Sequence, residues 1–310
     1  GYFMSIVITC PRYFSEVDNL KKLIMNSEYK IELATPKGQG FDAKEMKKNL
    51  QNAKIAVIGD DEINDDVINS CQNLELIIKW GVGTDNINIS TNFPTVLNTP
   101  GDIHIDVAEH VIYLIGSLLK QIPYIHKELL INSEWNKPIG SRLKNKNIGF
   151  IGFGRIAKYT AKLLQPFEVN IFYYDPYFDK LDNSIAQKKD LEFLQKTSDI
   201  LIVTASLTKE TRHLIDKQFF NNLEKKPHII NVSRGQIINE EDLVYALDNK
   251  LVSGCALDVF EKEPLKEKNP LKDFSNVIFS THNASNTSEA NNSVNQQVTD
   301  TLLKWSSEQN

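Results

Sequence analysis

The chain has 310 residues, of which 41% are hydrophobic and 24% charged, a balance typical of a globular protein and not of a disordered or fibrous one. A formal net charge of −5 leaves no basic stripe, so we expect neither a nucleic-acid nor a membrane partner. The three cysteines, Cys10, Cys71 and Cys255, form no disulfide framework or metal-ligand cluster, so we expect no metal and a cytoplasmic location. The most apolar run, 111–119, is too short to span a bilayer.

Strands and helices alternate along the first third of the chain, which predicts a parallel α/β layout. The expected strands are 5–9, 31–33, 55–58, 76–79 and 95–97, and the expected helices are 16–25, 42–50 and 65–70. A dense apolar helix over 106–120 follows. Because it is apolar on more than one face, we expect it to be buried or covered by a second chain. The segment around Trp135, Pro138 and Gly140 is expected to be irregular.

The stretch from Lys146 to Asp175 has the order of a dinucleotide-binding βαβ unit, with strands over 147–151 and 169–174. Gly152 permits a tight turn, Gly154 lets a pyrophosphate approach the backbone, and the N–H groups of the next helix favour its charge. The alternative is a strand–helix turn that binds nothing. Asp175 favours NAD, because its carboxylate would repel the 2′-phosphate of NADP and no arginine follows within three residues.

Three polar residues follow successive predicted strands over 229–232, 254–257 and 277–279, after a further strand over 200–204. They are Arg234, Glu263 and His282, and each alone could be an ordinary surface or loop residue. Together they supply a group for proton transfer, a carboxylate to orient it, and a guanidinium to grip a substrate carboxylate. A helix over 240–248 begins after Asn239, and the helical pattern of the C-terminal tail is expected to return to the first domain.

At these residues the sequence resembles the D-isomer-specific 2-hydroxyacid dehydrogenases, which include phosphoglycerate dehydrogenase, glyoxylate/hydroxypyruvate reductase and D-lactate dehydrogenase. The resemblance extends from about Lys54 to Thr287. Its motifs are 81–86, 98–101, 107–110, 152–156, 208–214, 231–235 and 256–260 with Glu263-Pro264. Departures from the family pattern are Thr281 before the histidine, the run 283–286 after it, and 204–206 after the third strand of the sheet.

The resemblance implies a role for each matching residue. It makes Arg234 the substrate-orienting arginine, Glu263 the partner of the histidine, and His282 the acid–base. It implies substrate contacts from Lys79, Gly81, Val82, Gly83 and Arg234. It implies cofactor contacts from Val82, Gly152, Gly154, Arg155, Ile156, Asp175, Ala205, Val232, Ser233 and Asp258.

The implied architecture is two doubly wound parallel-sheet domains. Residues 4–103 plus 284–310 would form a flavodoxin-like substrate domain, and 104–283 a Rossmann NAD-binding domain that includes a dimerisation helix. We expect a homodimer, hinges near 101–105 and 283–287 that close the substrate domain onto the cofactor domain, and no regulatory domain.

The expected activity is reversible hydride transfer between NAD(H) and a small 2-hydroxy or 2-oxo acid, with phosphoglycerate dehydrogenase as the nearest type. A glyoxylate/hydroxypyruvate reductase is the alternative, and a non-catalytic NAD-sensing dimer is an alternative of another class. Lys79 favours a phosphorylated substrate, whereas Ile58 stands where a second basic residue is usual, and the acids at 60–62 would repel a phosphate.

Overall fold

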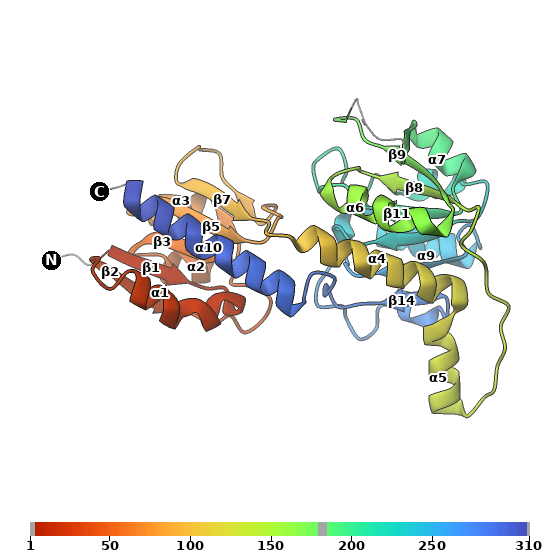
Figure 1. Cartoon of the computed structure of the whole chain (residues 1–310), viewed down its shortest axis with the longest axis horizontal. Helices are drawn as coiled ribbons and strands as arrows, with labels where there is room; N and C mark the ends of the chain where they lie inside the picture. Colours follow the sequence, from red (N-terminus) through yellow and green to blue (C-terminus); the bar gives the residue numbers. More distant parts are fainter. Residues whose placement is uncertain (1–3, 179–184, 309–310) are drawn as a thin grey trace. The chain divides into compact units, whose positions relative to one another are not determined.

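The predicted strands form two parallel sheets, one in each of two separately packed units of the chain (Figure 1). This computed structural model describes residues 4–178 and 185–308. Unit 1 comprises Gly1–Ile103 and Asn286–Asn310, and unit 2 comprises His104–Ser285. The second boundary therefore lies after Ser285, whereas the sequence places it after Asn283. The assignment of these units as substrate and NAD-binding domains stays a prediction.

The sheet of unit 1 has the strand order β2-β1-β3-β5-β7, all parallel. Its strands are β1 (Met4–Ile8), β2 (Tyr29–Leu33), β3 (Ala53–Ile58), β5 (Leu76–Trp80) and β7 (Thr95–Thr99). A separate two-stranded ladder joins β4 (Ile63–Asn64) to β6 (Ile87–Asn88). Renumbered within its own sheet, the order is 2-1-3-4-5, which confirms the flavodoxin-like topology.

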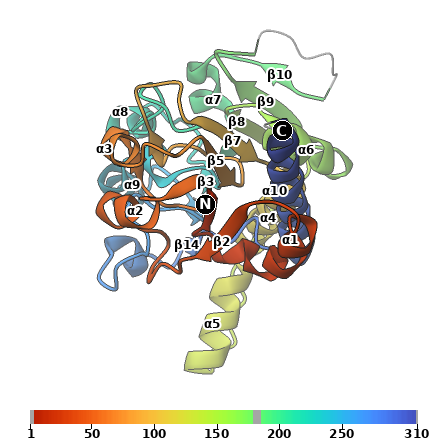
Figure 2. The same ribbon diagram turned by 90° about the vertical axis from the view of Figure 1, so that its left-hand side faces the viewer.

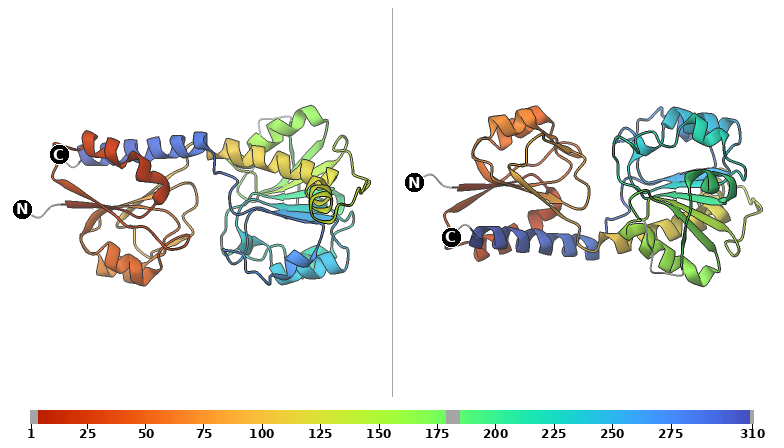
Figure 3. Two further views of the ribbon diagram at one scale, coloured as in Figure 1. Left: turned by 90° about the horizontal axis from the view of Figure 1, so that it is seen from below. Right: turned by 90° about the horizontal axis from the view of Figure 1, so that it is seen from above.

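Helices cover both faces of this sheet (Figures 2 and 3). One face carries the 3₁₀ helix η1 (Pro11–Glu16), α1 (Val17–Leu23) and α10 (Ser288–Glu308), and the other carries α2 (Ala43–Asn49) and α3 (Asp65–Ser70). Strand side chains alternate between the faces, so Ala56 and Ile58 pack with α2 and α3 while Ile55 and Val57 are buried on the side of α10. The C-terminal helix thus completes the fold that the N-terminal strand begins.

The sheet of unit 2 has seven parallel strands in the order β10-β9-β8-β11-β12-β13-β14. This doubly wound order confirms the predicted Rossmann fold. The strands are β8 (Asn147–Ile151), β9 (Asn170–Tyr174), β10 (Gln187–Lys188), β11 (Ile200–Val203), β12 (His228–Asn231), β13 (Gly254–Leu257) and β14 (Val277–Phe279).

Two sets of helices cover this second sheet. One face carries α4 (Ile103–Lys120) and α6 (Arg155–Leu164), and Figure 1 shows both in front of the strands. The other face packs against α7 (Leu191–Thr197), α8 (Lys217–Asn221) and α9 (Glu240–Asp248). Short 3₁₀ turns η2 (Gln165–Phe167), η3 (Gly235–Ile237) and η4 (Pro270–Asp273) complete the unit. Asn239 caps α9 as predicted, because its side chain accepts from the N–H of Asp242.

The helix α4 agrees with the sequence-based expectation, whereas α5 (Ile122–Asn132) was not predicted. The apolar residues of α4, including Val111 and Ile115, are buried within this chain, which confirms the predicted alternative of a buried helix, and the contact of α4 with a second chain stays a prediction. The segment around Trp135, Pro138 and Gly140 is irregular as expected, and the unpredicted α5 before it has no buried residue and extends away from its own sheet (Figure 1). Exposed apolar surface therefore lies on α5, which sequence analysis did not predict.

Within the described residues, no helix combines the length and the apolar character that a membrane crossing requires.

Candidate active site

The predicted catalytic residues of unit 2 follow three neighbouring strands at one edge of its sheet. Arg234 follows β12, Glu263 lies in the segment after β13, and His282 follows β14. Since β12, β13 and β14 are parallel neighbours, their carboxyl ends meet at the same edge. The fold therefore brings these three residues to one edge, where ligands bind in open α/β sheets.

His282 and Glu263 form a direct pair. The Nδ1 atom of His282 lies 2.7 Å from Oε2 of Glu263, and the other oxygen, Oε1, accepts from the N–H of Phe260 at 3.0 Å. Both carboxylate oxygens are thus engaged, which fixes the plane of the carboxylate. The imidazole uses Nδ1 for this contact, and Nε2 is its second ring nitrogen.

The backbone of His282 is held by Asp258. His282 has a left-handed φ of 53°, a conformation that non-glycine residues adopt rarely and that persists only where surrounding contacts impose it. Its N–H donates to the carbonyl of Asp258 at 2.7 Å, and the Asp258 carboxylate accepts from the N–H groups of Asn283 and Ala284 at 2.9 and 3.1 Å. Asp258, which is 1% exposed, therefore clamps the turn that presents the imidazole.

His110 of α4 lies close to that clamp. Its Nε2 lies 3.8 Å from Oδ1 of Asp258, beyond hydrogen-bond distance, and has no partner among the described residues. The sequence includes His110 in a family motif but assigns it no role. His110 and Asp258 are far apart in the sequence, and only the fold of unit 2 brings them close together.

Arg234 leads from β12 into η3, and its neighbours fix its main chain. Asn231 Nδ2 donates to the carbonyl of Arg234 at 3.0 Å, and the Arg234 Nη1 donates to the carbonyl of Ser233 at 2.9 Å. The next residue, Gly235, lies directly against Phe260, because a Cβ added at Gly235 would be 1.9 Å from the Phe260 carbonyl carbon. Only glycine allows this approach of the arginine segment to the segment that carries Glu263.

The turn between β8 and α6 fits a dinucleotide pyrophosphate. Gly152 has a φ of +87°, and a Cβ there would be 2.5 Å from the backbone of Ala205, so this position requires glycine. Gly154 has open space where a Cβ would stand, and no side chain caps the amino end of α6. Gly154 and Arg155 are exposed, which leaves the first N–H groups of the helix and a guanidinium accessible to phosphate oxygens.

Asp175 directly follows β9, where its carboxylate could accept a hydrogen bond from a hydroxyl of the adenosine ribose. Its Oδ2 accepts from the N–H of Phe153 at 2.8 Å and its Oδ1 from that of Tyr177 at 2.9 Å. Each oxygen keeps a second lone pair for a ribose hydroxyl. The Ser233 hydroxyl donates a hydrogen bond to the carbonyl of Ala205. Both residues are predicted to contact the cofactor. These features agree with a site for NAD.

The glycine loop after β5 belongs to unit 1. Gly81 has a φ of +93°, and its N–H donates to the hydroxyl of Thr99 at 3.1 Å, which in turn donates to the carbonyl of Lys79. Within the described part of the chain, the N–H groups of Val82 and Gly83 donate to no other group. Val82 and Gly83 therefore offer N–H groups in this loop. Thr99, which sequence analysis included in the motif 98–101 without a role, fixes the loop.

Lys79 is 4% exposed, so its charge is turned inward. Its Nζ donates to the carbonyl of Trp80 at 2.8 Å and lies 3.7 Å from Oδ1 of Asp60. In this position Lys79 holds the strand end that leads into the glycine loop. Direct contact with a substrate remains a prediction.

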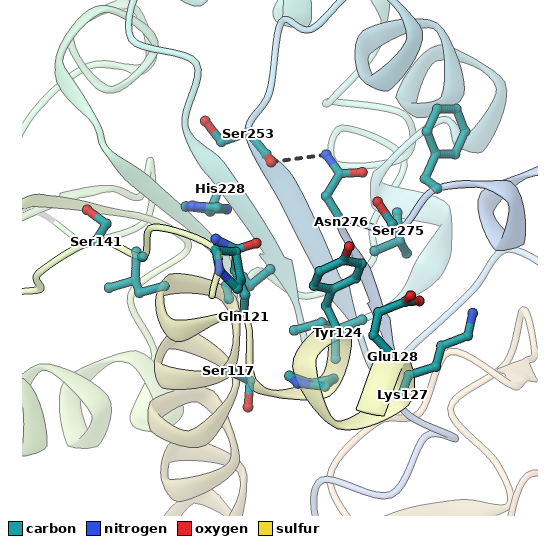
Figure 4. A pocket seen from close by; sticks show the side chains of 18 of the residues that line it. Ser117, Gln121, Tyr124, Lys127, Glu128, Ser141, His228, Ser253, Ser275 and Asn276 are labelled. Carbon is teal, nitrogen blue, oxygen red and sulfur yellow. Dashed lines mark hydrogen bonds between the residues drawn. The ribbon is translucent and has the colours of Figure 1, made fainter. Parts of the chain in front are cut away.

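A hollow with a volume of about 690 Å³ lies at the opposite edge of the unit 2 sheet (Figure 4). It is lined by the end of α4, the first half of α5, the amino ends of β12 and β13, and all of β14, with His228 and Asn276 among its side chains. Burial, and to a lesser extent the charge of Lys146, lowers the pKa of His228. Among residues 4–178 and 185–308, no three His, Cys, Asp or Glu side chains are grouped so as to hold a metal ion.

Comparison with known proteins identifies relatives of both units. The family model described as "D-isomer specific 2-hydroxyacid dehydrogenase, NAD binding domain" matches residues 112–284. A glyoxylate reductase from Thermofilum pendens is 38% identical over 243 residues, which cover 74% of this chain and 71% of that protein. A D-3-phosphoglycerate dehydrogenase from Bacillus subtilis is 34% identical over 251 residues, covering 79% of this chain and 47% of the relative. The matched region is thus about half the length of that relative.

Among solved structures, a NAD-dependent formate dehydrogenase from Staphylococcus aureus in complex with NAD has a TM-score of 0.84. It is 25% identical in sequence, and the superposition covers 97% of this chain and 95% of the other.

Proposed function

The chain belongs to the D-isomer specific 2-hydroxyacid dehydrogenase family, and from this premise we propose how its residues carry out the NAD-dependent reaction. The reaction interconverts a small 2-hydroxy acid and its 2-oxo acid. The observation that carries the proposal is the His282–Glu263 pair, with Nδ1 and Oε2 2.7 Å apart, at the sheet edge that also holds Arg234. That arrangement supplies a proton-transfer group, its counter-charge and an anion-binding group.

In this proposal His282 transfers the proton through Nε2. Nδ1 is committed to Glu263, so Nε2 accepts the hydroxyl proton during oxidation and donates a proton to the carbonyl oxygen during reduction. His282 is an imidazolium after it has accepted the proton in oxidation and before it donates the proton in reduction. The carboxylate of Glu263 stabilises this imidazolium. Asp258 acts through the backbone, since it holds the turn that sets the direction of the imidazole.

Arg234 and the glycine loop bind the substrate carboxylate in this scheme. A guanidinium can donate two parallel hydrogen bonds to a carboxylate, which fixes the plane of the substrate as well as its position. Unit 1 contributes the N–H groups of Val82 and Gly83, because the N–H of Gly81 already donates to Thr99. Uncharged donors of this kind orient a carboxylate without adding another charge.

The cofactor NAD, when bound, accepts or supplies the hydride. We propose that the amino end of α6 with Arg155 and Ile156 holds the pyrophosphate and that Asp175 holds the adenosine ribose. Asp258 would contact the nicotinamide amide, and Ala205, Val232 and Ser233 would also line the cofactor. The open space at Gly154 supports this assignment.

The test is oxidation of NADH in the presence of a panel of 2-oxo acids, followed by chiral analysis of the product. We expect turnover of at least one small 2-oxo acid and a D-2-hydroxy acid as product. In Glu263→Gln, which keeps a hydrogen-bonding group but removes the charge, we expect kcat to fall about 10- to 100-fold with little change in NADH affinity. Absence of turnover with every acid, in a protein that binds NADH, would favour the non-catalytic NAD sensor instead.

The choice between a phosphoglycerate dehydrogenase-like enzyme and a glyoxylate or hydroxypyruvate reductase depends on the far end of the substrate. The T. pendens relative carries the name of a glyoxylate reductase and the B. subtilis relative that of a phosphoglycerate dehydrogenase. Phosphorylated and unphosphorylated acids in the same panel separate these two functions. We further propose a reducing cytoplasmic location, consistent with the free thiols of Cys10, Cys71 and Cys255.

We also propose that the protein is a homodimer, assembled through α5 and the segment after it. Leu130, Ile131, Trp135 and Ile139 are between 65% and 95% exposed, an unusual density of apolar surface for one segment. The hollow of Figure 4 lies directly beside it, along the edge strand β14. A two-fold axis would let α5 of each copy cover the hollow of the other, because such an interface is self-complementary.

Sedimentation velocity at micromolar concentration tests the homodimer. Leu130→Asp should weaken dimerisation at least about 100-fold, since the symmetry places the unfavourable charge in the interface twice. Met25→Asp is the matched control, because Met25 is 75% exposed but lies on unit 1. A monomeric unmodified protein, or equal behaviour of the two variants, would refute this interface.

A further inference from the structure

The carboxyl edge of the unit 1 sheet carries an exposed arginine that sequence analysis did not single out. Arg12 lies in η1, directly after β1, and its guanidinium carbon is 4.7 Å from the centre of the Trp80 ring. Trp80 is the last residue of β5 and precedes the glycine loop. Because β1, β3 and β5 are parallel neighbours, Arg12 and that loop share one edge of the sheet.

A single buried amide holds both partners of this stack. Asn295 of α10, which is 3% exposed, accepts from Trp80 Nε1 at 2.8 Å and donates through Nδ2 to the carbonyl of Arg12 at 3.0 Å. Since the indole N–H can only donate, these two bonds also fix which way the amide points. The guanidinium is therefore carried by a rigid support, although the side chain itself is exposed.

The acids at this edge leave the charge of Arg12 uncompensated. Within the described part of the chain, no carboxylate forms an ion pair with Arg12. Asp61 is buried, and its oxygens accept from Thr9 and from the N–H groups of Phe41 and Gly59. Glu62 accepts from the N–H of Ala43 at the start of α2.

The remaining acid is already matched with a lysine. Asp60 lies 3.7 Å from Lys79, whose ammonium is buried and donates to the Trp80 carbonyl. Of the acids at 60–62, only Asp60 therefore lies near a cation in this part of the structure, and that cation is Lys79. Arg12, rather than Lys79, presents the accessible positive charge beside the glycine loop.

We propose that Arg12 is a specificity-determining residue that binds a second anionic group, a phosphate or carboxylate, at the far end of the substrate. This inference rests on the proposed function, because it takes the glycine loop as the site of the 2-oxo acid carboxylate. A substrate held by its carboxylate at Val82 and Gly83 would extend its other end along the edge that Arg12 occupies. The preferred substrates are then 2-hydroxy and 2-oxo acids with two anionic groups.

The kinetic test compares substrates that differ only in the second anionic group. We would measure kcat and KM for hydroxypyruvate and its 3-phosphate, and for pyruvate and oxaloacetate, with the unmodified protein and with Arg12→Gln, Arg12→Lys and Lys22→Gln. Lys22 is an exposed cation on α1 and controls for the general charge of unit 1. We expect Arg12→Gln to lower kcat/KM for the dianionic acids about 10- to 100-fold, mainly through KM, and to change the monoanionic acids less than about 3-fold.

Arg12→Lys should retain part of the preference, because a lysine keeps the charge but not the planar fork. Equal losses for both substrate classes in Arg12→Gln, or no preference for dianions in the unmodified protein, would overturn the inference while leaving the dehydrogenase function intact.

A binding experiment separates this proposal from the proposed activity. Titration calorimetry in the presence of NAD would compare D-glycerate with 3-phospho-D-glycerate, without any need for turnover. We expect the unmodified protein to bind the phosphorylated acid at least about 10-fold more tightly, and Arg12→Gln to lose most of this difference. If no 2-oxo acid is turned over but this difference is present, the dehydrogenase proposal fails and the assignment of Arg12 stands. If the two acids bind equally to the unmodified protein, the assignment of Arg12 is wrong.

Discussion

The carboxyl edges of the two sheets hold their functional groups in different ways. In unit 2, side chains fix side chains, since Glu263 orients the imidazole of His282 and Asp258 clamps the turn behind it. In unit 1, the hydroxyl of Thr99 fixes a backbone loop that begins at Gly81. Proton transfer requires titratable side chains, whereas binding a carboxylate requires only N–H donors in a rigid loop. Changes at His282 and Glu263 of unit 2 should therefore act on turnover, and changes in the glycine loop of unit 1 on substrate affinity.

The largest effect is expected from His282→Ala. Loss of the proton-transfer group should lower kcat by about 100-fold or more, while NADH affinity, measured by fluorescence titration, stays nearly unchanged. A correctly folded variant that keeps its turnover would contradict the assignment of proton transfer to the unit 2 edge. The same assignment fails if the variant loses only substrate affinity.

Asp175 lies at the same edge as His282 but contacts the cofactor rather than the reacting atoms in our assignment. Asp175→Ala should weaken NADH binding about 10-fold and relax discrimination against NADPH, because the carboxylate that would repel the 2′-phosphate is gone. Asp175→Asn keeps an acceptor for the N–H of Phe153 and should relax the discrimination with a smaller loss of NADH affinity. A preference of the unmodified protein for NADPH would contradict this role.

Thr99→Val tests the edge of unit 1. The variant keeps the shape of the side chain but leaves the N–H of Gly81 without its acceptor, so the glycine loop should lose its fixed position. We expect KM for the 2-oxo acid to rise about 5- to 10-fold while kcat changes less than about 2-fold. Should kcat fall as much as it does in His282→Ala, unit 1 would have a direct part in catalysis.

The smallest effect on activity is expected at His228, at the opposite edge of the unit 2 sheet. Burial lowers the pKa of His228, so protonation favours the unfolded chain, and stability is lost as pH falls below the ordinary value of about 6.5. In His228→Leu the free energy of unfolding, measured in urea, should decrease less between about pH 7.5 and pH 5.5 than in the unmodified protein. Activity near neutral pH should stay within about 2-fold, and a large loss would show that this edge also serves the reaction.

Much of the fold could be predicted because period and spacing are local properties. The strand, glycine turn and helix from Asn147 to Leu164, and the strands that precede Arg234 and His282, follow from runs of apolar residues with polar residues after them. Neither α7 nor α8 was predicted, because each is too short to show a helical period clearly. The exposed helix α5 was missed for another reason, since its apolar residues do not mark a buried face within this chain.

The supporting residues of the site could not be predicted from spacing. Thr99 and Asn295 act through hydrogen bonds to residues distant in sequence, and such contacts exist only after the sheets have formed. Arg12 lies in a short 3₁₀ helix with no motif around it. The apolar pattern of α4 predicted that its faces are covered, but hydrophobicity alone could not show which part of the molecule covers them.

The contact of Gly235 with Phe260 limits how this protein can be redesigned. Even a methyl group at position 235 would overlap the Phe260 backbone, so it would push apart the two segments that carry Arg234 and Glu263. A mutational library that includes this position would record lost activity there, although glycine has no chemical part in the reaction. Engineering of new substrate preferences should therefore keep Gly235 constant and vary the exposed residues around the glycine loop of unit 1.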